Sequence, residues 1–380
     1  MSEAGMEPQP MVRITCMAHQ LLETAVTDCL SSLGIQDILV ENGRCVRQRV
    51  RARPFGLPGQ RMDLQDAPMD VFQMTVVSDA TERVARALID AADLRTPGRG
   101  MVYVQDVVAY GYSETATLSS GLDSPSGTPN LLPDMTLLTC ILSMGGSGEA
   151  LARLVLTFGL GVPVITRGAG TGLRHRMGLW RIAIPAEKEI VRFMIPAHDA
   201  DGVRRLLIEE SRIDRPGGGF LYQTPVREGM ADPLTRLGPQ PYAATMEQVI
   251  AALDEIKGGT KWRTRYAGLR DRDEELDRQT LCDYREIAFV CSEGNAEELV
   301  RAAMRVGSGG ATTSTANCLR PGSENAGGGF RETGILCVPC HLCEPVIDAL
   351  LGVAVTRDDD ACRIQVLEAP AVFTHQQKDS

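Results

Sequence analysis

The densest group of reactive side chains in the sequence is a cysteine–histidine cluster near the C-terminus. It reads Cys337-Val-Pro-Cys340-His341-Leu-Cys343. Thiolate and imidazole groups at such spacings ligate zinc, and closely spaced cysteines also hold iron–sulfur clusters. A second cysteine pair, which a closed zinc site of this kind would use, is missing from the sequence. Structural thiols are therefore the default interpretation, and metal binding and a redox role are the alternatives.

Two short turns combine glycine with arginine, which suits the binding of an anion. Glycine lets backbone N–H groups point at a phosphate, and a guanidinium adds charge-assisted hydrogen bonds. An ordinary turn between a helix and a strand would use the same residue types, and that alternative stays open. The predicted ligand-binding residues are Arg95, Thr96, Gly98, Arg99 and Gly100 in the first turn and Arg215, Gly217, Gly218 and Gly219 in the second.

A further candidate is a run of arginines at every second position. An extended segment would place all of them on one face, where they would suit an acidic ligand or an acidic partner surface. A solvated, mobile arm is the alternative. A similar mixture of glycine and arginine follows later in the chain. The arginines predicted to contact a ligand or a protein partner are Arg47, Arg49, Arg51, Arg53, Arg174 and Arg176.

A repeated pattern of strands and helices must position these groups. Apolar strands that end near Cys16, Cys140 and Cys291 each precede an amphipathic helix that stops near a glycine. After a loop, a second apolar strand leads through a turn into a second helix, and a last strand closes the pattern. This order is that of the ferredoxin-like βαββαβ unit. The three cysteines are expected to be core residues that face the helices, with a thiol triad on a common axis as the alternative.

The sequence thus predicts an α+β protein of three ferredoxin-like βαββαβ domains. Their predicted bounds are residues 1–112, 135–229 and 284–380. A linker rich in Ser, Gly and Pro is expected at residues 113–134. A helical connector is expected at residues 230–283, where Thr245 and Gln248 form a capping box ahead of an apolar stripe.

The repeated unit resembles the PII signal-transduction (nitrogen regulatory PII-like) superfamily. The resemblance rests on a first helix that ends Leu30-Ser-Ser-Leu33-Gly34-Ile35 and on a long loop at residues 42–69, in the place of the family's T-loop. It also rests on a strand that runs through Pro339 into a helix, and on the turn at residues 95–100, which looks like the family's B-loop. The resemblance implies three tandem divergent copies that form a pseudo-trimer within one chain.

The resemblance also implies a function. Adenine nucleotides (ATP, ADP or AMP) would bind at the clefts between the copies, and the long loops would contact a protein partner. Two departures limit this expectation. The lysine that usually follows the B-loop glycines is missing, and the third copy carries Asp358, Asp359 and Asp360 where phosphates would lie.

Composition restricts the class of protein. The chain has 380 residues, of which 43% are hydrophobic and 23% are charged, as in ordinary globular proteins. A net charge of −10 argues against general nucleic-acid binding. Apolar runs fall far short of the ~20 residues that a bilayer span needs, so an integral membrane segment is not expected. Residues 1–10 lack the features of a secretory signal, which predicts a cytoplasmic protein.

These observations together predict a regulatory or signalling protein that is not an enzyme. It would bind a small anionic effector and relay its presence to a partner through mobile loops. Known catalytic fingerprints such as the nucleophile elbow do not occur in the sequence. An enzyme or metal-binding protein that uses one specialised cleft or the cysteine cluster is one alternative, and a structural adaptor is another. No cofactor is firmly indicated, and a resident metal is not expected.

Overall fold

A computed structural model gives the architecture of most of the chain. It describes residues 7–52, 60–112, 131–143, 145–172, 187–211, 213, 215, 218–232, 255, 280–320 and 329–374. For residues 48–52 and 60–64 it describes the backbone alone. The expected capping box and apolar stripe of the connector lie outside the described residues.

The described elements fall into three successive stretches of chain. The first contains β1 (Gln9–His19), α1 (Glu23–Ser32), β2 (Ile38–Ala52), β3 (Gln60–Val76), α2 (Thr81–Ala91) and β4 (Gly100–Tyr110). The second contains β5 (Leu132–Ser143), α3 (Ser147–Thr157), β6 (Val164–Gly172), β7 (Glu187–Pro196), α4 (Ala200–Ser211) and β8 (Phe220–Met230). The third contains β9 (Tyr284–Ser292), α7 (Ala296–Arg305), β10 (Gly310–Leu319), β11 (Phe330–Pro339), α8 (Cys343–Thr356), β12 (Arg363–Ala369) and β13 (Ala371–Thr374). Short 3-10 turns precede four of the helices, at Gln20–Leu22, Ser78–Ala80, Ala197–Asp199 and Cys340–Leu342.

All of these strands belong to one antiparallel sheet. The 13 strands follow the order β10-β11-β9-β12-β4-β1-β3-β2-β6-β7-β5-β8-β13. Additional pairings of β10 with β2 and β6, and of β4 with β8, join strands that are distant in this order. These pairings close the sheet on itself into a barrel.

The prediction of three separate ferredoxin-like domains in a pseudo-trimer is therefore wrong. The structure is a closed, ten-stranded antiparallel barrel within a 13-stranded sheet. An independent ferredoxin-like sheet would leave two edge strands with unpaired backbone N–H and C=O groups. In this chain the edges pair with one another: β2 lies against β6 and β10, and β4 lies against β8 and β12. The sheet is consequently shared by all three stretches of the described chain.

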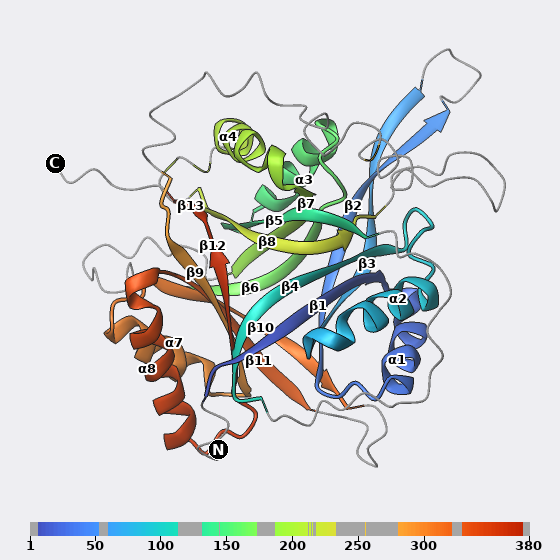
Figure 1. Cartoon of the computed structure of the whole chain (residues 1–380). Helices are drawn as coiled ribbons and strands as arrows, with labels where there is room; N and C mark the ends of the chain where they lie inside the picture. Colours follow the sequence, from blue (N-terminus) through green and yellow to red (C-terminus); the bar gives the residue numbers. More distant parts are fainter. Residues whose placement is uncertain are drawn as a thin grey trace.

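Three pairs of helices cover the outside of the barrel, and the strands lie between them (Figure 1). Each pair (α1 with α2, α3 with α4, α7 with α8) packs on the sheet through its own apolar cluster. Cys16, Cys140 and Cys291 are each buried in one of these clusters. Burial raises the pKa of all three thiols, so they stay protonated. The prediction that they are core residues beside the helices is confirmed.

Glycines end the first helix of each stretch, as predicted. Gly34, Gly159 and Gly307 all have positive φ angles, of 74°, 66° and 112°. After α1, the Ile35 N–H donates to the Leu30 carbonyl at 3.0 Å, which is the bond of a Schellman motif. Asp79 and Glu82 have the spacing of a capping box, but no such box forms, because a 3-10 turn precedes α2 and the N-cap of α2 has no side-chain hydrogen bond.

The prediction of a long loop at residues 42–69 is also wrong. Most of this segment is a hairpin in which β2 pairs with β3 from Leu39↔Gln73 out to Ala52↔Gln60. The physical reason is the alternation of arginines with other residues, since a period of two suits a strand better than a loop. Residues 53–59 lie outside the described chain.

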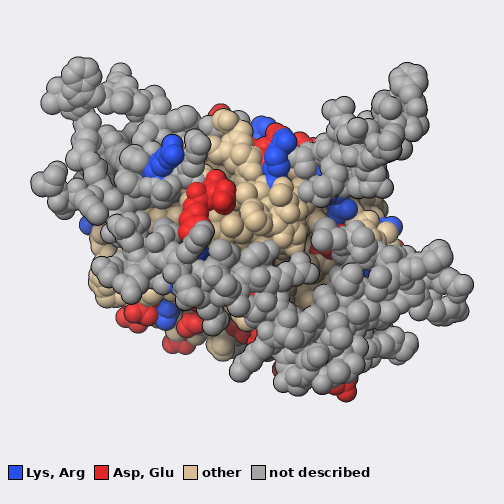
Figure 2. Space-filling model, turned by 90° about the horizontal axis from the view of Figure 1, so that it is seen from above, with Lys and Arg blue, Asp and Glu red and all other residues tan. Residues whose placement is uncertain are grey.

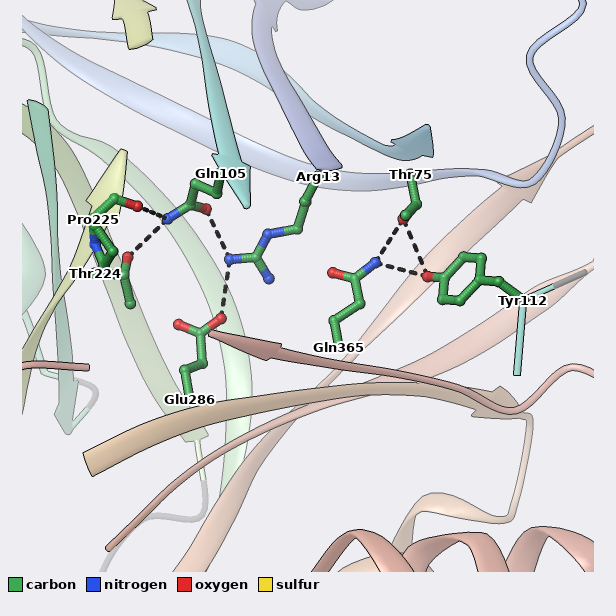
Figure 3. A network of polar contacts seen from close by, with 8 residues as sticks. All are labelled: Arg13, Thr75, Gln105, Tyr112, Thr224, Pro225, Glu286 and Gln365. Carbon is green, nitrogen blue, oxygen red and sulfur yellow. Dashed lines mark hydrogen bonds and ion pairs between the residues drawn. The ribbon is translucent and has the colours of Figure 1, made fainter. Parts of the chain in front are cut away.

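The inner surface of the barrel carries a buried polar network (Figure 3). Arg13 Nη2 donates to Gln105 Oε1 at 2.8 Å and to Glu286 Oε1 at 3.0 Å. Gln105 Nε2 donates in turn to Thr224 Oγ1 at 2.9 Å and to the Pro225 carbonyl at 3.0 Å. These residues come from β1, β4, β8 and β9, so the network connects all three stretches of the chain.

A second buried ion pair crosses the interior. Arg192 on β7 lies 4.0 Å from Glu41 on β2, and its Nη1 donates to Thr166 Oγ1 at 3.0 Å. Glu41 Oε1 also accepts from Ser314 Oγ at 2.9 Å and from Thr333 Oγ1 at 3.1 Å. Buried charges of opposite sign are thus paired and hydrogen-bonded, which the low dielectric of an interior requires.

Glu286→Ala is expected to lower the free energy of unfolding by about 3–5 kcal/mol, because the Arg13 guanidinium would stay buried without its ion partner. Denaturant titration measures this loss. Arg301→Ala is the matched control, because it breaks the exposed Arg301–Glu297 pair on α7 and should cost less than ~1 kcal/mol. Equal losses in the two variants would contradict a structural role for the network.

Candidate functional site

The first predicted anion-binding turn lies between α2 and β4, and its arginines face the end of the helix. Arg99 Nε donates to the Ala92 carbonyl at 2.6 Å, and Arg95 Nη1 donates to Asp90 Oδ1 at 2.6 Å. Thr96 Oγ1 donates to Asp93 Oδ2 at 2.5 Å. Cationic side chains at this place stabilise the last carbonyls of a helix. Arg95, Thr96 and Arg99 therefore help to build the turn.

The backbone of the same turn binds a carboxylate from elsewhere in the chain. The Gly98 N–H donates to Asp232 Oδ1 at 2.9 Å. The other carboxylate oxygen, Asp232 Oδ2, forms an ion pair with the guanidinium of Arg47. The Asp232 side chain is 1% exposed and that of Arg47 is 24% exposed. A backbone N–H group and a guanidinium thus converge on one buried anion.

Three distant elements bring these groups together. Arg47 lies on β2, Gly98 lies in the turn before β4, and Asp232 lies two residues beyond the end of β8. The pairing of β8 with β4, at Met230↔Val102, places the end of β8 beside the start of β4. The site therefore exists because the sheet is closed.

Glycine is required twice in the turn. Gly98 has a φ of 96°, and a Cβ atom there would lie 2.9 Å from Arg47 Nη1. Gly100 has a φ of 140°, and a Cβ atom there would lie 1.9 Å from the Met17 carbonyl oxygen. A side chain at residue 98 would displace Arg47, and one at residue 100 would push β4 away from β1.

The second predicted turn is arranged differently. The Gly218 N–H donates to the Arg215 carbonyl at 2.8 Å, and the Arg215 side chain is exposed. Gly219 has a φ of 152°, and a Cβ atom there would lie 2.9 Å from the Ile141 carbonyl oxygen. Gly217 lies outside the described residues. The described part of this turn matches the alternative of an ordinary turn.

The structure describes no side-chain contacts for the remaining predicted arginines. Arg49 and Arg51 lie on β2 at alternate positions with Arg47, but only their backbone is described. Arg53, Arg174 and Arg176 lie outside the described residues. The contact of these five arginines with a partner stays a prediction.

The third turn holds a carboxylate of its own. Asp359 accepts hydrogen bonds from the N–H and hydroxyl of Ser292, from Asn295 Nδ2 and from the Ala361 N–H, at 2.7–3.1 Å. Burial alone would raise the pKa of Asp359, but the bonds from Asn295 and Ser292 outweigh it and lower that pKa. This carboxylate fastens the turn to the start of α7, which is a structural role.

The cysteine–histidine cluster is spread over two environments. Cys337 is half-buried on β11, whereas its neighbours Leu336 and Val338 point into the opposite, helix-facing core. Cys340 and His341 lie exposed in the 3-10 turn before α8. Burial raises the pKa of Cys337 and of Cys343, which disfavours the thiolates that metals bind. Among the described residues, no three His, Cys, Asp or Glu side chains are grouped to hold a metal ion.

A small cavity lies beside the interior network. Its volume is about 50 Å³, and Arg13, Glu41, Thr75, Arg192 and Gln365 are among the residues that line it. Next to it, Gln365 Nε2 donates to Thr75 Oγ1 at 2.6 Å and to the Tyr112 hydroxyl at 2.7 Å (Figure 3). A space of this size holds a few water molecules and is far too small for a nucleotide. The cavity is therefore not a candidate nucleotide site.

The surface seen in Figure 2 gives no sign of a broad area of one charge among the described residues. Basic and acidic residues lie beside one another there. Among the described helices, none is long and apolar enough to cross a membrane.

Sequence reasoning missed Asp232. It belongs to no motif and lies inside the segment that was predicted as a helical connector. The only signal that leads to it is the pairing of β4 with β8, which local sequence patterns do not reveal.

Comparisons with known proteins add a limited result. No family model and no curated protein matches the sequence. Among solved structures, the chain is similar to B. subtilis GlnK, with 11% identity over 29% of this chain and 96% of that one and a TM-score of 0.23. A B. subtilis GlnK–ATP complex is similar over 26% of this chain and 86% of that one, with the same identity and TM-score. At TM-scores this low, the resemblance to the PII superfamily and its three tandem copies stay a prediction.

The buried carboxyl group of Asp70 lacks the hydrogen bonds that acidic residues at the equivalent positions of the sheet make. Asp70 on β3 has the same place in the sheet as Glu189 on β7 and Glu332 on β11. Both glutamates accept backbone N–H bonds at the start of a neighbouring helix, at 2.8–3.0 Å. Within the described residues, Asp70 Oδ2 is buried and has no hydrogen-bond partner. Burial, with a smaller contribution from the charge of Glu23, raises the pKa of Asp70 to about 6.

Asp70→Asn is expected to stabilise the protein at pH 8 and to have little effect at pH 4. The wild-type carboxyl group favours folding while it is protonated, and this contribution is lost as the pH rises from the ordinary pKa of about 4 through about 6. Denaturant titrations at pH 4, 6 and 8 should show a difference in the free energy of unfolding that grows by about 1–3 kcal/mol. The exposed Asp348→Asn variant on α8 serves as control. A difference that does not change with pH would contradict the raised pKa.

Proposed function

We propose that the chain is a regulatory protein that binds a small anionic effector, such as an adenine nucleotide, through the Gly98 turn and Arg47. The observation that carries this proposal is the convergence of the Gly98 N–H and the Arg47 guanidinium on one carboxylate. Backbone N–H groups of a glycine turn, together with an arginine, are a common means of binding phosphate. The Asp232 carboxylate has the charge and hydrogen-bonding character of such a ligand.

The position of Arg47 supplies a route from effector to partner. Arg47 lies on β2, and the same strand continues to Arg49 and Arg51 towards the tip of the hairpin. An effector that holds Arg47 favours one arrangement of this strand, and a protein partner that binds the outer arginines would respond to the change in population. Effector identity, the partner and a cytoplasmic location are parts of the proposal that rest on the sequence.

Isothermal titration with ATP, ADP, AMP and inorganic pyrophosphate tests the proposal. At least one of these ligands should bind to the wild-type protein. Arg47→Ala and Gly98→Ala should weaken that binding by about tenfold or more, because each removes or displaces a charge-assisted contact to the anion. Arg215→Ala, in the second turn, is the matched control and should bind like the wild type.

Two results would count against the proposal. An absence of heat with all four ligands would contradict the proposal that the protein binds a small anionic effector. A loss of affinity in Arg215→Ala as large as that in Arg47→Ala would move the site away from the Gly98 turn.

A further inference from the structure

The Asp232 carboxylate occupies the place that an effector phosphate needs. We propose that Asp232 is a built-in competitor: the effector binds by displacing this carboxylate, and the returning carboxylate expels the effector. This inference rests on the proposed function, and it adds the regulation of the same site.

Competition follows from the number of donors. Gly98 has a single N–H group, and it donates to Asp232 Oδ1 at 2.9 Å. The Arg47 guanidinium is in contact with the other carboxylate oxygen. A phosphate on the same donors would lie within a few ångströms of the carboxylate, and two like charges at that distance in a water-poor site repel strongly. The two anions therefore exclude one another.

The displaced carboxylate has to move into water. A buried carboxylate without partners is costly, and Asp232 would lose both of its partners to the effector. Asp232 is two residues from Met230, the last residue of β8. Its movement therefore pulls on the rungs Met230↔Val102 and Gly229↔Tyr103, which join β8 to β4. Effector binding is thereby coupled to one of the pairings that close the barrel.

Asp359 shows what a purely structural carboxylate looks like in this fold. It belongs to its turn and accepts four hydrogen bonds, one from the Ala361 N–H and three from Ser292 and Asn295, which lie 64–67 residues earlier in the chain. Asp232 has two partners, the Gly98 N–H and the Arg47 guanidinium, and it lies outside the turn that it contacts. Removal of Asp232 leaves those donors, Gly98 N–H and Arg47, in position for another anion, which is the property that a competitor requires.

Titration of wild type and Asp232→Asn with ATP and with pyrophosphate tests the inference. The asparagine keeps the shape and can still accept the Gly98 N–H, but it lacks the charge. The variant should bind about tenfold tighter or more, which corresponds to the release of one charge-assisted hydrogen bond. Asp348→Asn is the matched control, because it removes one exposed negative charge from α8, an element that contributes no residue to the site. Its affinity should equal that of the wild type.

A second measurement uses the unmodified protein, in case Asp232→Asn folds poorly. Hydrogen exchange in saturating ATP should stay slow at Gly98, where the anion takes over the N–H group that Asp232 accepts in the free protein. It should become faster at residues 226–232, where β8 loosens. Unchanged or slower exchange at residues 226–232 would overturn the coupling, because the effector would then bind without displacement of Asp232.

The outcomes separate the two proposals. Tighter binding by Asp232→Asn than by the wild type supports the competitor. Equal affinity of Asp232→Asn and wild type overturns the competitor and leaves the effector site standing. An absence of binding by both proteins overturns the effector site and the competitor together.

Discussion

The structure depends on one constraint, which is that the backbone groups at the edges of a β-sheet must find partners. Each stretch of this chain offers two such edges, and they pair with the edges of the other stretches rather than with solvent. The sheet therefore closes and acquires an inner surface. Because water has little access to that surface, its charges must neutralise one another, and Arg13 with Glu286 and Arg192 with Glu41 do so across the barrel.

The same closure creates the candidate anion site. β2, the Gly98 turn and the end of β8 are far apart in sequence, and no one of them contains both the N–H donor and the guanidinium. Closure of β8 onto β4 carries Asp232 to the Gly98 turn, and β2 brings Arg47 to the same point. A site of this kind is a property of the tertiary fold. A change in the β4–β8 pairing should therefore alter the binding of the anion, and replacement of the anion should alter the β4–β8 pairing.

Local features of the fold could be predicted from the sequence because they depend on near neighbours. Gly34 ends a helix because only its own turn decides the positive φ, and Cys16 is buried because its strand alternates with the period of a sheet. The same period was visible in Arg47, Arg49 and Arg51, yet a loop was predicted there from a resemblance. Closure of the sheet and the contact of Asp232 with the Gly98 turn could not be predicted, because the pairing of distant strand edges leaves no signal in local periodicity.

The three turns that precede the last strand of each stretch show how unequal similar elements can become. The described part of the second turn satisfies its Gly218 N–H within the turn, and the third is fastened by Asp359 from its own sequence. In both turns the acceptor, the Arg215 carbonyl or the Asp359 carboxylate, belongs to the turn itself. In the first turn the Gly98 N–H donates to a carboxylate from another part of the chain, so this donor is filled only while the end of β8 is in place. Of the three described turns, it is the one whose anion can be replaced without loss of the turn itself, because Arg95 and Arg99 hold that turn independently of Asp232.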